Sequence, residues 1–104
     1  GIHLFINHRR RFDENLYPFV KKLKSGLIGE ILQVNAHYVY GLLTTGTHLV
    51  DTLRFFLNEI AGEVKWVIGF ENTFQCFSPD DDPCTDFIMC FENGLKVFIQ
   101  SLNT

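Results

Sequence analysis

The sequence lacks a basic excess and a long apolar run, and each absence argues against one class of protein. Nine Lys and Arg residues stand against twelve Asp and Glu residues, which gives a net charge of -3. Dedicated nucleic-acid binders usually have a clear basic excess. No apolar stretch approaches the roughly 20 residues that a membrane-spanning helix needs. We therefore expect no nucleic-acid partner and no membrane partner.

Several motifs are also missing, because the sequence contains no GxGxxG, no P-loop and no GxSxG. Its cysteines, Cys76, Cys84 and Cys90, form no CxxC pair, and an odd count makes a poor disulfide framework. We interpret them as buried free thiols of a reducing compartment, which predicts a cytoplasmic protein. The first residues turn polar and basic too soon for a signal peptide, so we expect none. Since the chain begins without Met, we expect a longer native protein.

The first half of the chain predicts a strand, a helix and a second strand. Ile2–Asn7 is short, apolar and β-prone. A stripe at i, i+3, i+4 and i+7 then predicts a helix that begins at Asn15 and ends near Gly26. Alternation of apolar and polar residues predicts a strand over Glu30–Tyr40. Its expected buried positions are Leu32, Val34, Ala36, Tyr38 and Tyr40.

The second half predicts one more helix and three strands. The helix runs from about Thr45 to Leu57, with its entrance in the small residues that follow Gly41. Val64–Phe70 alternates as a strand, with Val64, Trp66, Ile68 and Phe70 expected on one face. Pro79–Pro83 reads as an exposed, solvated loop rather than a cation site. Asn93-Gly94 predicts a type I′ turn between strands over Cys84–Glu92 and Leu95–Leu102.

These elements predict an α+β fold, a mainly antiparallel open sheet with two helices on one face. The opposite sheet face also bears Phe, Tyr and Val residues. An apolar outer face often marks a partner surface. We therefore expect a homo-oligomer that forms through this sheet face.

His48 is the best candidate for chemistry, because an imidazole at a helix entrance can exchange a proton near neutral pH. The alternative is a histidine that only stabilises the turn. His48 and Asp51 could also begin a metal site with His37 or His8. A structural Asp51–Arg54 pair is simpler, and we expect no metal.

Two further groups of polar residues have open interpretations. Thr44, Thr45 and Thr47 offer hydroxyl groups for helix capping or for a polar ligand. Arg9–Arg11 form either a solvated face or a site for carboxylates or phosphates.

Two segments resemble a known family. NHRRRFDENLYPFVKKLKSGLIGEILQVNAHYVYG is similar to the opening of the C-terminal domain of the glucose-fructose oxidoreductase, inositol dehydrogenase and MocA oxidoreductases. TTGTHLVDTLRFFL is similar to their helix with a histidine followed by Asp and Arg. Order and spacing agree with the family over about half of the chain. The resemblance implies an enzyme that uses NAD or NADP on a sugar, an inositol or a related polyol.

The resemblance also assigns roles to single residues. His48 matches the family histidine beside the reacting hydroxyl group. An Asp is common four residues earlier, where this chain has Thr44. As a substrate wall we select Arg11, Tyr38, Tyr40 and Thr44.

By the resemblance, residues 1–104 form a partial C-terminal domain for substrate binding and oligomerisation. The N-terminal Rossmann domain, which binds the nucleotide and supplies a lysine, is absent from the sequence. We therefore expect no cofactor on this chain alone and no turnover by it. A non-catalytic α+β module for binding or dimerisation is the alternative.

Overall fold

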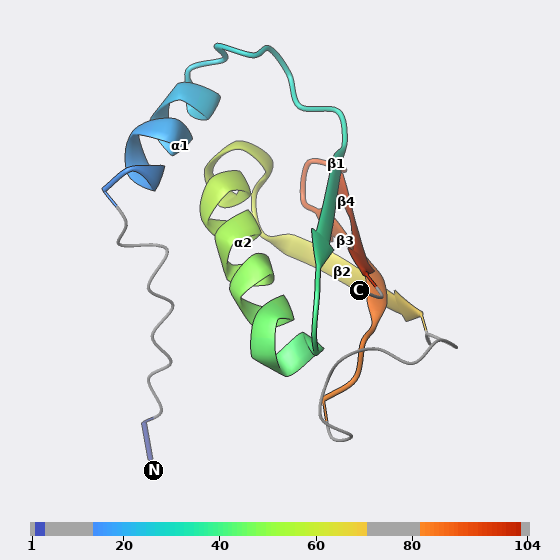
Figure 1. Cartoon of the computed structure of the whole chain (residues 1–104). Helices are drawn as coiled ribbons and strands as arrows, with labels where there is room; N and C mark the ends of the chain where they lie inside the picture. Colours follow the sequence, from blue (N-terminus) through green and yellow to red (C-terminus); the bar gives the residue numbers. More distant parts are fainter. Residues whose placement is uncertain (1, 4–13, 71–81, 103–104) are drawn as a thin grey trace.

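The computed structural model describes residues 2–3, 14–70 and 82–102 (Figure 1). In chain order the elements are α1 (Leu16–Lys24), β1 (Val34–Tyr38), the π-helical turn η2 (Leu42–Gly46), α2 (Thr47–Ala61), β2 (Val64–Phe70), β3 (Asp86–Phe91) and β4 (Lys96–Ser101). The strands form one open sheet in the order β1-β4-β3-β2. The pair β1–β4 is parallel and the other two are antiparallel. The predicted α+β class is confirmed.

Helix α2 covers the inner face of this sheet. Leu53, Leu57 and Ala61 lie one turn apart along α2, so they form a single buried stripe. The sheet residues packed in the same core include Phe87, Met89, Phe91, Val97 and Ile99. Alternate residues of a strand point to opposite faces, which explains why β4 buries every second position and β3 buries Phe87, Met89 and Phe91, with Cys90 buried in addition.

Helix α1 packs against α2 (Figure 1). The rings of Phe19 and Phe56 meet edge to face, with centroids 5.6 Å apart. Lys24 Nζ lies 2.9 Å from Glu59 Oε2. Glycine Gly26 adopts a φ of 80° and ends the helix as predicted. No helix among the described residues is both long enough and apolar enough to span a membrane.

The strand predicted over Glu30–Tyr40 is shorter than expected. Only Val34–Tyr38 have ladder partners, all of them on β4, so β1 ends where that pairing ends. Leu32 is 80% exposed and Tyr40 is 54% exposed, which contradicts their predicted burial. Tyr40 also has a φ of 64°, a left-handed conformation that is incompatible with a strand.

Strand β2 contains an irregularity that the sequence pattern did not reveal. Its register against β3 shifts between Val64 and Trp66. Val64 pairs with Phe91 and packs against the inner core. Trp66, Ile68 and Phe70 pair with Cys90, Ile88 and Asp86 on the outer face. The predicted common face of Val64 and Trp66 is therefore wrong, because a bulge reverses the alternation between them.

The hairpin between β3 and β4 is confirmed, but its predicted type I′ turn is wrong. Among the described non-glycine residues only Tyr40 has a positive φ, so Asn93 does not. Gly94 alone has one here, at 93°. The Asn93 side chain instead accepts a hydrogen bond from Leu95 N at 2.9 Å, and Phe91 N donates to Leu95 O. The turn is thus a three-residue loop with glycine at its left-handed position.

Candidate functional site

The candidate site is the entrance of α2, which is preceded by a π-helical turn, a wider winding than the α-helix. Thr45 N and Gly46 N both donate to Gly41 O, at 3.0 and 3.3 Å, and this closes the π-helical turn η2. A side chain at Gly46 would meet Leu42 at 2.8 Å, so glycine lets the turn close tightly. Helix α2 proper begins at Thr47 rather than at the predicted Thr45. It continues past Leu57 to Ala61, where Gly62 ends it with a φ of 82°.

The carboxylate of Asp82 binds this entrance from a distant part of the chain. It accepts hydrogen bonds from Leu43 N at 2.6 Å and Thr44 N at 2.9 Å, and also from Thr44 Oγ1. The next residue, Pro83, accepts a bond from Leu42 N at 2.8 Å through its carbonyl oxygen. The Thr44 hydroxyl group, predicted to cap the helix or to meet a ligand, therefore binds Asp82.

Asp82 is 5% exposed, so the prediction that the whole of Pro79–Pro83 is an exposed loop is wrong at this position. Asp80 and Asp81 lie outside the described residues. Burial acts to raise the pKa of Asp82, but the bonds from Thr44 and Leu43 outweigh it, and the pKa lies below its ordinary value. Nothing in the run of three aspartates distinguishes Asp82 as the residue that binds the helix.

His48 lies in the first turn of α2 and is partly buried. Its backbone carbonyl accepts a hydrogen bond from Thr52 Oγ1 at 2.8 Å. The metal alternative would need His37, which lies on β1 and lines a pocket on the outer sheet face, away from α2. His8 lies outside the described residues. Within those residues, no group of three His, Cys, Asp or Glu side chains could hold a metal ion.

The predicted substrate-wall residues occupy different environments. Tyr38 is buried, and its hydroxyl donates to Thr85 O at 2.6 Å and accepts from Thr85 N at 2.9 Å. Burial raises the pKa of this phenol. Tyr40 is exposed just before the entrance turn. Arg11 lies outside the described residues. Contact of any of them with a substrate stays a prediction.

A pocket of about 500 Å³ lies beside the entrance, between α2 and β2. Val50, Val67 and Met89 contribute apolar surface to it, and Thr47, Asp51 and Arg54 contribute polar groups. Arg54 Nη2 lies 3.4 Å from Glu63 Oε2. The predicted Asp51–Arg54 pair stays a prediction. His48 does not line this pocket, since Thr47, Val50, Asp51 and Arg54 form a neighbouring stripe of the helix.

The cysteines differ from the sequence-based interpretation. Cys84 is disulfide-bonded, so the prediction of free thiols is wrong for this residue. Cys90 is a buried free thiol as predicted. Cys76 lies outside the described residues.

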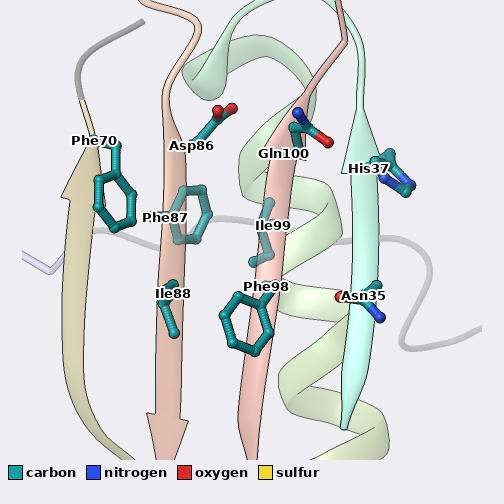
Figure 2. Close-up of a pocket in the computed structure, with 9 residues that line it drawn as sticks. All are labelled: Asn35, His37, Phe70, Asp86, Phe87, Ile88, Phe98, Ile99 and Gln100. Atoms are coloured by element: carbon teal, nitrogen blue, oxygen red, sulfur yellow. The ribbon is translucent and has the colours of Figure 1, made fainter.

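The outer sheet face forms a second surface of interest. Figure 2 shows it from the side opposite α2, with side chains from all four strands beside one another. Ile88, Phe98 and Phe70 provide apolar surface in a pocket of about 360 Å³. Asn35, His37 and Gln100 provide polar groups at one side of it. This surface has the apolar character that the sequence predicted for the outer face.

Comparison with known proteins gives a structural match. No protein-family model matches the sequence, and no curated protein matches it significantly. The chain is similar to a crystal structure of an NAD-binding protein from Listeria innocua, with a TM-score of 0.67 and 22% identity. The match covers 98% of this chain and 33% of that protein. The chain therefore spans about a third of that protein's length, and at this identity the likeness establishes the fold alone.

Proposed function

We propose that this chain is the substrate-side C-terminal portion of an NAD(P)-dependent oxidoreductase of the glucose-fructose oxidoreductase, inositol dehydrogenase and MocA type. The observation that supports this most is the match of nearly the whole chain to one third of an NAD-binding protein. The two segments that resemble this family both lie within the part of the chain that the structural match covers, so the resemblance and the match concern the same domain. The substrate would be a sugar, an inositol or a related polyol.

The residues of this chain do not fit a dinucleotide. The sequence has no GxGxxG loop, and a Rossmann site holds the pyrophosphate at such a loop and the helix that follows it. The proposal therefore assigns NAD or NADP to another part of the native protein, and we derive no step through the nucleotide from this chain.

What this chain would supply is a histidine at a fixed helix entrance. An imidazole can accept a proton from a substrate hydroxyl group or return it near neutral pH. We assign this role to His48 in the first turn of α2. The exposed ring of Tyr40 and the entrance residue Thr44 lie within eight positions of His48, and with Arg11 and Tyr38 they remain our proposed substrate wall.

The outer sheet face supports a further part of the proposal, a homo-oligomer. Trp66, Ile68 and Phe70 of β2 are exposed and lie on the same face as Phe98 of β4. A contiguous exposed apolar face of this kind is typical of a protein–protein contact. The same observation supports the second candidate function, a non-catalytic α+β module that dimerises. A dimer is expected under both candidates, so it does not distinguish them.

The length of the native polypeptide distinguishes the two candidates. A Rossmann portion would add roughly 100–150 residues or more. We expect the intact mass of the native protein to exceed this chain by at least that amount, and the native protein to bind NAD or NADP. A native polypeptide of the 104 residues alone would contradict the enzyme and leave the dimerising module.

An assay of the isolated chain supplies the matching control. The chain lacks the dinucleotide loop, so we expect it to show no hydride transfer and no useful affinity for NAD or NADP. Hydride transfer by the isolated chain would contradict the assignment of the nucleotide to another part of the protein.

A further inference from the structure

The entrance of α2 lacks a cap of its own. Neither Gly41 before η2 nor Gly46 before α2 provides a side-chain cap. The first amide groups of a helix have no acceptor within the helix, so they need one from outside. Leu43 N and Thr44 N both find that acceptor in the Asp82 carboxylate, at 2.6 and 2.9 Å.

The segment that contains Asp82 completes the hydrogen bonding of the whole turn. Leu42 N donates to Pro83 O, and Thr44 adds its hydroxyl group to the Asp82 carboxylate. The remaining two amides of η2, Thr45 N and Gly46 N, donate to Gly41 O. Each of the five amides of this turn thus has an acceptor, and Asp82–Pro83 supply three of the five bonds.

The backbone at Gly41 makes room for this contact. A Cβ atom at Gly41 would overlap the carboxyl group of Asp82. Gly41 is buried and has an ordinary φ of -83°, so its lack of a side chain matters here for space rather than for backbone freedom. The Asp82 carboxylate can therefore occupy this place only because position 41 is glycine.

From these contacts we propose that Asp82 is the positioning residue for His48, because it holds the entrance turn of α2 from a distant part of the chain. That this positioning matters for catalysis rests on the proposed function, in which His48 transfers a proton. His48 follows Thr44 by four residues, about one helical turn. The placement of its imidazole therefore depends on how the entrance turn is held. The same bonds lower the pKa of Asp82, because they stabilise its ionised form.

The first test measures the position of His48 directly. In the native full-length protein with uniform nitrogen-isotope labelling, NMR would report both the His48 imidazole, assigned with a His48→Gln variant, and the backbone amides of the entrance turn. We expect Asp82→Ala to shift or broaden this signal and to move the amide signals of Leu43 and Thr44. Gly41→Ala displaces the same carboxylate without altering Asp82, so it should have the same effect. If Asp82→Ala does not fold, Gly41→Ala decides the outcome.

A control variant at Asp86 tests whether the loss of any carboxylate that binds a backbone amide would change the His48 signal. Asp86 Oδ1 accepts a hydrogen bond from Ser101 N at 2.8 Å, so it too binds a backbone amide, but within the sheet. We expect Asp86→Asn to leave the His48 signal unchanged. A His48 signal that is unchanged in both Asp82→Ala and Gly41→Ala would overturn the proposal.

The second test measures catalysis by the native protein. A misplaced proton-transfer group lowers the rate of the chemical step, and we expect kcat to fall about 10- to 100-fold in Asp82→Ala with KM for the nucleotide unchanged. An unchanged kcat in an active protein would overturn the positioning role. If the wild-type protein shows no hydride transfer, the proposed function fails, while the NMR measurement still decides whether Asp82 positions His48.

Discussion

The two faces of the sheet both carry large apolar side chains, but in opposite environments. On the inner face, Met89 is 2% exposed and Phe91 is 0% exposed beneath α2. On the outer face, Ile68 is 50% exposed and Phe98 is 37% exposed. Ile88 and Met89 are neighbours in β3, yet only Met89 is fully buried. The environment of an apolar residue here is decided by whether α2 covers its face.

Apolar residues on the two faces of this sheet therefore differ in what they can stabilise. The inner residues stabilise the monomer, since removing them from water contributes to the free energy of folding. The outer residues remain partly exposed in the monomer and so contribute less to its folding, and our proposal is that a second copy of the protein covers them. Substitutions on the two faces should therefore give different kinds of effect.

The largest loss of unfolding free energy is expected for Phe91→Ala on the inner face. Phe91 is fully buried against α2, and truncating a buried Phe costs about 3–5 kcal/mol of unfolding free energy through lost burial and a cavity. Denaturant unfolding would measure it. The matched outer variant Phe98→Ala should cost less than about 1 kcal/mol in the monomer. Equal losses at the two positions would break the distinction between the faces.

A smaller effect is expected for Tyr38→Phe, which keeps the ring but removes the hydroxyl group. The amide and carbonyl of Thr85 would each lose a partner, which costs about 1–3 kcal/mol. Thermal unfolding would measure the loss. Steady-state kinetics of the native protein would show whether Tyr38 also contacts substrate, because a purely structural role leaves KM unchanged. A raised KM without a loss of stability would reverse our interpretation of its environment.

An outer-face charge should weaken self-association without unfolding the monomer. Ile68→Lys places an ammonium group in the middle of the exposed apolar face beside Ile88. If this face joins two copies, the dissociation constant should rise by more than about tenfold. Analytical ultracentrifugation of wild type and variant would measure it, with Tyr17→Lys on exposed α1 as control. The outer face is not the contact if Ile68→Lys associates like wild type.

The smallest effect is a dependence of stability on acid pH. The pKa of Asp82 is lower in the folded protein than in the unfolded chain, where it is about 3.9. Its contribution to stability is therefore fully present above about pH 4 and is lost as the pH falls through the folded pKa. Unfolding temperatures measured over this range should fall less steeply for Asp82→Asn than for wild type. Parallel curves would show that Asp82 has no lowered pKa.

The local elements were predictable because their signals are local. The stripe of α2, the alternation of β3 and β4 and the Asn93-Gly94 hairpin all follow from residues within a few positions of one another. The inner burial of Tyr38 also followed from alternation. The bulge between Val64 and Trp66 did not, because a shift of one residue leaves no mark in composition.

The candidate site was predictable only in part, because it joins distant residues. His48 and its helix entrance were recognisable from one short segment. The contact between Asp82 and Thr44 joins positions 38 residues apart, and neither local pattern nor resemblance pointed to it. The sequence indicated only that position 44 had no carboxylate. Only the folded structure shows that the carboxylate of Asp82 binds at Thr44.

We propose that His48 exchanges the hydroxyl proton in a nicotinamide-dependent oxidoreductase. The most direct measurement is hydride transfer by the native full-length protein, with and without His48→Asn, over a panel of sugars, inositols and related polyols. We predict nicotinamide reduction or oxidation with at least one of them, and a loss of about 100-fold or more in kcat for His48→Asn. A fully active His48→Asn protein, or no transfer by wild type that binds NAD or NADP, would contradict the account.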